Sequence, residues 1–193
     1  MKLRLRDLFR NYALPGAIGF AVFLALTGGR VLDTADLGWL RTGDLQQHFV
    51  GWHFFRNTEF WQSPLGSNRA FCMELGSSIV YTDSLPLLAI PLKAIHTWLP
   101  DVFQYIGWWI LACFLLQAAL AWRLIGRFTG NWWLQACATA FFCLSPPFLF
   151  RLHGHDALFG HWIVLSALLL YFSAAFFPAR WLALLRVAAL THA

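Results

Sequence analysis

Four apolar stretches of about 20 residues constrain the fold of this chain more than any other feature. An α-helix rises about 1.5 Å per residue, so 20 residues reach about 30 Å, the thickness of the hydrocarbon core of a bilayer. Each stretch is therefore predicted to be a transmembrane helix, and residue 181 is the possible start of a fifth. The four predicted spans are residues 14–32, 105–124, 132–150 and 158–177.

The composition favours an all-α fold, a polytopic transmembrane helical bundle. Of the 193 residues, 59% are hydrophobic and only 12% are charged, whereas charged residues make up about a quarter of a soluble domain. The net charge of +5 is small. No nucleic acid is expected as a partner, because nucleic-acid binding requires a basic patch on a soluble face. The four cysteines form no C-x-x-C pair and are expected to be small core residues.

The N-terminus allows two interpretations, because basic residues are followed there by an apolar run. A cleaved signal peptide has this pattern, but no clear A-x-A cleavage site follows the run. We expect an uncleaved first helix with its N-terminus in the cytoplasm. The chain stops soon after residue 181, so we also expect it to be truncated at its C-terminus.

Residues 85–99 are apolar but too few to cross a membrane, and they include the charged Lys93. If this segment lies on the membrane surface, the basic residues of the later loops join those of the N-terminus on the cytoplasmic side, as the positive-inside rule requires. If it spans, those residues are exported. The sequence therefore predicts one long external loop, residues 33–103, with surface helices at about 45–58 and 85–99. The expected location is the inner membrane of a bacterium.

The external loop opens with a carboxylate and an imidazole at the start of its first surface helix. Asp44 stands where this helix begins, so its carboxylate is expected to cap free backbone N–H groups. His48 lies four residues later and shares a helix face with Asp44. Asp44 is a candidate catalytic residue, with a capping role alone as the alternative. His48, His53 and Arg56 are candidate substrate-binding residues.

Asp83 lies just before the second surface helix, in the sequence Thr82-Asp83-Ser84-Leu85-Pro86. Asp83 or Ser84 is expected to cap that helix, with Pro86 in its first turn. Since capping does not exclude catalysis, Asp83 is a second candidate catalytic residue.

The second external loop follows the third span. It is expected to place titratable groups on the same side of the membrane as Asp44. Ionisable residues at a membrane edge are functional candidates, although histidines are also tolerated at headgroup level. Asp156 is a third candidate catalytic residue. Asp44 and Asp156 are also candidate ligands for Mg or Mn, although no metal-binding motif is present. The candidate substrate-binding residues of this loop are Arg151, His153 and His155.

These motifs resemble those of the GT-C class of membrane glycosyltransferases, which carry an essential acidic residue early in a long first external loop. Gly43-Asp44-Leu45-Gln46-Gln47-His48 is similar to that motif, and His155-Asp156-Ala157-Leu158 is similar to the second-loop pattern. GT-C enzymes carry many more spans than this chain. The chain also resembles an uncharacterised bacterial membrane family of the same architecture, through Gly51-Trp52-His53-Phe54-Phe55-Arg56, Thr82-Asp83-Ser84-Leu85-Pro86-Leu87 and Phe103-Gln104-Tyr105.

The resemblance implies transfer of a sugar from a polyprenyl-phosphate-linked donor in the membrane to a glycan or lipid acceptor on the outer face. Asp44 would be the general base on the acceptor hydroxyl. Arg151 would pair with the donor phosphate, together with one of the two following histidines. Asp83 or Asp156 would orient the acceptor or hold a metal.

Two other functions remain open from the sequence. A polytopic transporter or lipid flippase also carries polar groups among its helices, but many transporters show inverted repeats, and the sequence shows none. A non-catalytic membrane subunit is the third possibility.

Overall fold

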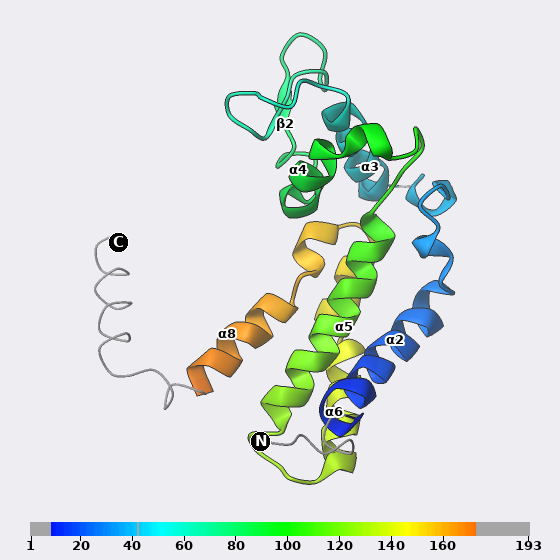
Figure 1. Cartoon of the computed structure of the whole chain (residues 1–193). Coiled ribbons are helices and arrows are strands. Elements are labelled where there is room, and N and C mark those ends of the chain that lie inside the picture. The colour runs from blue at the N-terminus through cyan, green and yellow to red at the C-terminus, as the bar shows by residue number, and fades with distance from the viewer. Residues whose placement is uncertain (1–8, 42, 173–193) are drawn as a thin grey trace, which may run out of the picture.

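The computed structural model describes residues 9–41 and 43–172, and their fold confirms the prediction of an all-α protein (Figure 1). A two-residue antiparallel strand pair is the one addition, β1 (Ser67–Asn68) with β2 (Ser77–Ser78). The α-helices are α2 (Leu14–Thr27), α3 (Asp44–Arg56), α4 (Pro86–Ala94), α5 (Ile106–Ile125), α6 (Trp132–Cys143), α7 (Pro146–Phe150) and α8 (Trp162–Phe172).

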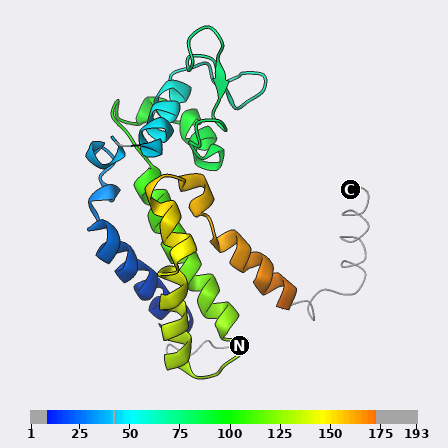
Figure 2. The ribbon, with the colours of Figure 1, turned by 180° about the vertical axis from the view of Figure 1, so that it is seen from behind.

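Within the described residues, three helical segments are long and apolar enough to cross a membrane: Phe9–Thr27, Ile106–Ile125 and Trp132–Phe150. They lie side by side in both views of the ribbon (Figures 1 and 2). Gly19 brings α2 close to α5, because a Cβ at this position would lie 2.7 Å from the carbonyl oxygen of Phe114. Small residues at such contacts let helix backbones approach closely. Phe23 and Phe114 are fully buried beside this contact, with ring centroids 6.0 Å apart.

The helix bounds differ from the predicted spans where glycine or proline intervenes. The first helical segment begins at Phe9, where a π-helical turn (Phe9–Ala13) leads into α2. It ends at Thr27, because Gly28 adopts a left-handed conformation with φ of 62° and its N–H caps the carbonyl of Leu24. The expected span of residues 14–32 therefore ends early. Its last residues form a separate 3-10 turn, Arg30–Leu32.

The third span is interrupted and the fourth is described only in part. Helix α6 ends at Cys143 and α7 restarts at Pro146, since proline lacks the N–H needed to continue a helix. Helix α8 begins at Trp162, after a 3-10 turn (Asp156–Phe159). The last residues of the predicted span 158–177, and the segment from residue 181, lie outside the described residues.

Helices α3 and α4 and the strand pair gather beyond the end of the bundle where α5 begins (Figure 1). The segment predicted as the second surface helix consists of α4 and a 3-10 turn, His96–Trp98. The nine residues of α4 reach about 14 Å, too short to cross a bilayer. Gln104 ties this part to the bundle, because its side-chain amide donates to the carbonyls of Val31 and Asp33.

Arg56, a candidate substrate-binding residue, is buried, and its guanidinium donates to backbone carbonyls. Its side chain is 5% exposed. Its two terminal nitrogens donate to the carbonyl at the start of the His96–Trp98 turn and to three carbonyls just after the turn. Its guanidinium lies 5.7 Å from the ring centre of Trp52. The guanidinium of Arg56 therefore stabilises the connection between α4 and α5. The acceptors are the carbonyls of His96, Leu99, Pro100 and Asp101.

Candidate active site

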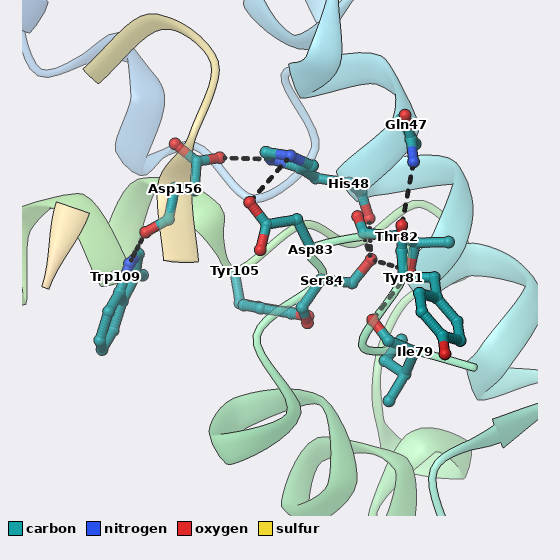
Figure 3. Close-up of polar contacts among 10 residues, drawn as sticks. All are labelled: Gln47, His48, Ile79, Tyr81, Thr82, Asp83, Ser84, Tyr105, Trp109 and Asp156. Atoms are coloured by element: carbon teal, nitrogen blue, oxygen red, sulfur yellow. Dashed lines mark hydrogen bonds and ion pairs between the residues drawn. The ribbon is translucent and has the colours of Figure 1, made fainter. Parts of the chain in front are cut away.

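His48 stands between two carboxylates from distant parts of the chain, at the junction between the bundle and the α3–α4 part (Figure 3). Its Nδ1 lies 3.0 Å from Oδ2 of Asp156, and its Nε2 lies 3.6 Å from Oδ2 of Asp83. The imidazole is buried on the inner face of α3. We call these three residues the His48 cluster.

Asp83 is the part of the His48 cluster that solvent reaches, with a side chain 34% exposed. Its backbone has a φ of 53°, and that of Leu85 is 52°. Such left-handed conformations cost energy for residues with a side chain and are found where the surrounding structure enforces them. The strained turn directs the carboxylate of Asp83 toward α3.

Close packing against α3 enforces this turn. The hydroxyl of Ser84 donates to the carbonyl of His48 at 2.7 Å and lies 2.8 Å from the hydroxyl of Thr82. Tyr105 donates from its hydroxyl to the carbonyl of Ser84. A Cβ at Gly51 would lie 2.3 Å from Thr82, so only glycine allows this approach. Ser84 was expected to cap α4, but its hydroxyl is used here, and neither it nor Asp83 caps that helix.

Asp156 is the buried member of the His48 cluster, with 0% exposure. Its Oδ2 contacts His48, whereas its Oδ1 has no hydrogen-bond partner among the described residues. Its backbone carbonyl accepts from the indole N–H of Trp109 on α5 at 2.7 Å. Burial raises the pKa of Asp156, although the hydrogen bond and charge of His48 act in the opposite direction. Desolvation of a carboxylate disfavours its charged form.

Asp44 is exposed at the first turn of α3, next to the second loop. Its Oδ2 would lie 3.4 Å from a Cβ at Gly154, an ordinary van der Waals distance, so the carboxylate lies beside this part of the second loop. The expected capping role is not observed, since the N-cap residue is Gly43 and no side chain caps the helix. The structure therefore brings Asp44 and the loop that carries Asp156 to the same end of the bundle.

Arg151 and His161 line a cavity of about 370 Å³ beside this loop. Its other walls are Pro146, Pro147 and Phe150. The sequence analysis did not include His161 among the site residues, although it is the third histidine of the same loop. His155 is partly exposed and close enough for its charge to act on Asp156. The side chain of His153 lies outside what the structure describes.

His53 is not among the residues that contact the His48 cluster. It lies five residues after His48, about 140° further around the helix, and is exposed next to the rings of Phe49 and Phe54. The structure thus separates the two histidines that the sequence analysis grouped together.

Asp44 and Asp156 were predicted as possible ligands of Mg or Mn. Within the described residues no three His, Cys, Asp or Glu side chains are grouped as ligands for one ion. Oδ2 of Asp156 contacts the ring of His48, whereas its Oδ1 has no hydrogen-bond partner among the described residues. A metal at this site stays a prediction, and no step of the proposed reaction uses one.

Three residues that support the site were not anticipated. Ser84 and Trp109 donate to the backbone carbonyls of His48 and Asp156, and Tyr105 donates to the carbonyl of Ser84. In the sequence, Trp109 and Tyr105 look like ordinary aromatic residues at the start of an apolar helix. Only the three-dimensional packing shows that their polar atoms are used.

The fold and the site define the class: an all-α protein with three helices long and apolar enough to cross a membrane, and a buried histidine held by carboxylates at one end of them. The chain belongs to the family described as a domain of unknown function, DUF6311, which matches residues 16–193. No curated protein and no solved structure matches the chain.

Proposed function

We propose that this protein is a membrane glycosyltransferase that moves a sugar from a polyprenyl-phosphate-linked donor to an acceptor hydroxyl. One observation supports the proposal above the others. At one end of the apolar helices, Asp44 lies beside Gly154 of the second loop, and His48 lies between Asp83 and Asp156. A lipid-linked donor presents its sugar–phosphate bond at this level of a membrane. There an exposed carboxylate and a basic group can act on the two sides of the bond.

In the proposed reaction the acceptor oxygen bonds to the anomeric carbon of the sugar while the bond from that carbon to the phosphate oxygen breaks. Asp44, which is exposed, takes the proton of the acceptor hydroxyl as general base. The electron pair of the broken bond stays on the polyprenyl phosphate. Arg151 and His161 line the cavity proposed to receive this phosphate, where positive charge stabilises the leaving group.

The His48 cluster has a positioning role in this proposal. His48 holds Asp83 at the edge of the site, and Asp156 holds His48 from the buried side. Asp83 can then accept a hydrogen bond from a second hydroxyl of the acceptor and orient it. Correct orientation contributes strongly to catalysis, since a misplacement of about 1 Å can cost about 100-fold in rate.

The test is a transfer assay with the protein reconstituted in vesicles and a panel of radiolabelled polyprenyl-phosphate sugars. We expect consumption of one lipid-linked sugar and a labelled product. Asp44→Asn should lower the turnover by about 100-fold or more, Arg151→Gln should mainly raise the KM for the donor, and Glu74→Gln, an exposed acid in the same loop, should change neither. Unchanged transfer in Asp44→Asn would remove that residue from the mechanism.

A flux assay on the same vesicles separates the proposal from a transporter or flippase. Movement of a solute or of the lipid-linked sugar across the membrane, without any sugar transferred, would contradict the proposed reaction. The topology is checked by labelling single cysteines at His155 and Arg127. The proposed inner-membrane arrangement predicts labelling of the first position from outside the cell and of the second only from inside.

A further inference from the structure

A second polar cavity lies at the other end of the bundle, where α5 ends and α6 begins, the lower end in Figure 1. Its volume is about 560 Å³, larger than that of the cavity beside Arg151. Residues from the first turn, the α5–α6 connection and α8 line it. The residues that matter for its chemistry are Arg10, Tyr12, Trp122, Arg123, Arg127 and Gln135.

The lining of this cavity is basic. It includes three arginines and no acidic residue. Every acidic residue that the structure describes lies between Asp33 and Asp156, in the segments at the opposite end. The guanidinium of Arg123 lies 5.6 Å from the ring centre of Tyr12. A guanidinium stacked on a ring keeps its in-plane N–H groups available for an anion.

Trp122, one of the residues that line this cavity, carries a buried donor without an acceptor. Trp122 is 1% exposed, and its indole N–H has no hydrogen-bond partner among the described residues. The carbonyl of the same residue accepts from the side-chain amide of Gln135 at 2.7 Å. Because buried polar groups are almost always hydrogen-bonded, an unpartnered N–H among arginines indicates a ligand rich in acceptor oxygens.

We propose that this cavity binds the phosphate headgroup of an anionic membrane phospholipid. Leu169 and Leu170 give it an apolar wall suited to the start of an acyl chain. At the same end Phe128, Trp132 and Trp133 are exposed aromatic residues, which are typical of the headgroup level of a membrane. Basic pockets between transmembrane helices bind such headgroups in other proteins. This proposal does not depend on the proposed glycosyl transfer.

Native mass spectrometry of the purified protein, titrated with phosphatidylglycerol or phosphatidylcholine, tests the proposal. We expect phosphatidylglycerol to bind about tenfold more tightly or better. The double variant Arg10→Gln/Arg123→Gln should lose this preference, whereas the control Arg41→Gln/Arg69→Gln, two exposed arginines outside this cavity, should keep it. Arg123→Lys retains the charge and should keep most of the preference.

Equal binding of the two lipids, or an unchanged preference in the double variant, would overturn the proposal. So would displacement of phosphatidylglycerol by inorganic phosphate at equal concentration, which would identify a soluble phosphate compound as the ligand. Trp122→Phe removes only the indole N–H and should weaken phosphatidylglycerol binding without loss of helical circular dichroism. This variant keeps the test decisive if the double variant fails to fold.

Discussion

His48 and Asp156 lie 108 positions apart in the sequence and meet in a buried contact of 3.0 Å. The contact joins helix α3 to the loop before α8, at the end of the bundle where α5 begins. When one partner of a buried hydrogen bond is removed, the other polar group is left unsatisfied, so the two side chains are expected to be coupled.

A double-mutant cycle on His48→Asn and Asp156→Asn should show this coupling. We expect an interaction free energy of about 1–3 kcal/mol in the free energy of unfolding, measured by denaturant titration in mixed micelles. The pair His48→Asn and Glu74→Gln provides the control, and its effects should add within about 0.5 kcal/mol. Additive effects for the first pair would mean that the contact does not stabilise the protein.

The raised pKa of Asp156 predicts how stability depends on pH. Because burial raises it above its ordinary value of 3.8, the folded protein holds this proton more tightly than the unfolded chain. The contribution of Asp156 to the free energy of unfolding is therefore fully present below pH 3.8 and is lost as the pH rises through the raised pKa. The free energy of unfolding, measured across a pH series, should decrease as the pH rises, and Asp156→Asn should abolish that decrease. A variant with an unchanged pH profile would contradict the assignment to Asp156.

The lowered pKa of Lys93 predicts that stability depends on pH with the opposite sign. Its amine is buried, donates to the hydroxyl of Thr58 at 2.7 Å and lies 4.0 Å from the ring centre of Phe55. Burial lowers its pKa from 10.5 to about 8, so the unfolded chain binds this proton more tightly. Stability should rise as the pH increases from about 8 to 10.5. Lys93→Met should flatten that rise and raise the melting temperature at neutral pH; a lower melting temperature would show that the amine stabilises the fold.

Gly51 should be intolerant of a side chain. Alanine would place its Cβ 2.3 Å from Thr82 and 2.6 Å from the Ser84 hydroxyl, and would push the turn that carries Asp83 away from His48. We expect a loss of about 1–3 kcal/mol in the free energy of unfolding. Gly16→Ala is the matched control, since no atom lies within 4 Å of a Cβ there. It should be neutral or stabilising, because alanine favours helix. Equal effects of the two substitutions would refute the packing argument.

Arg56→Lys distinguishes a structural role for Arg56 from a substrate-binding one. A lysine cannot reproduce the fork that serves four backbone carbonyls. We expect a loss of about 2 kcal/mol or more in the free energy of unfolding, measured in the same micelles. The KM of the folded variant in the transfer assay should not change. A raised KM with wild-type stability would return Arg56 to the substrate site.

The sequence by itself determined the helical class and the helices long enough to cross a membrane, because a run of about 20 apolar residues has few other stable states. It also pointed to Asp44, Asp83 and Asp156, since carboxylates are conspicuous in an apolar chain. Only the tertiary structure shows that His48 lies between Asp83 and Asp156. It also shows that Asp156 is buried and that Asp44 is exposed. Those outcomes depend on contacts between residues far apart in the chain, such as Gly51 against Thr82, which no local pattern records. The same reason applies to Arg56: its charge suggested a ligand, whereas the tertiary structure places its guanidinium where it donates to four backbone carbonyls.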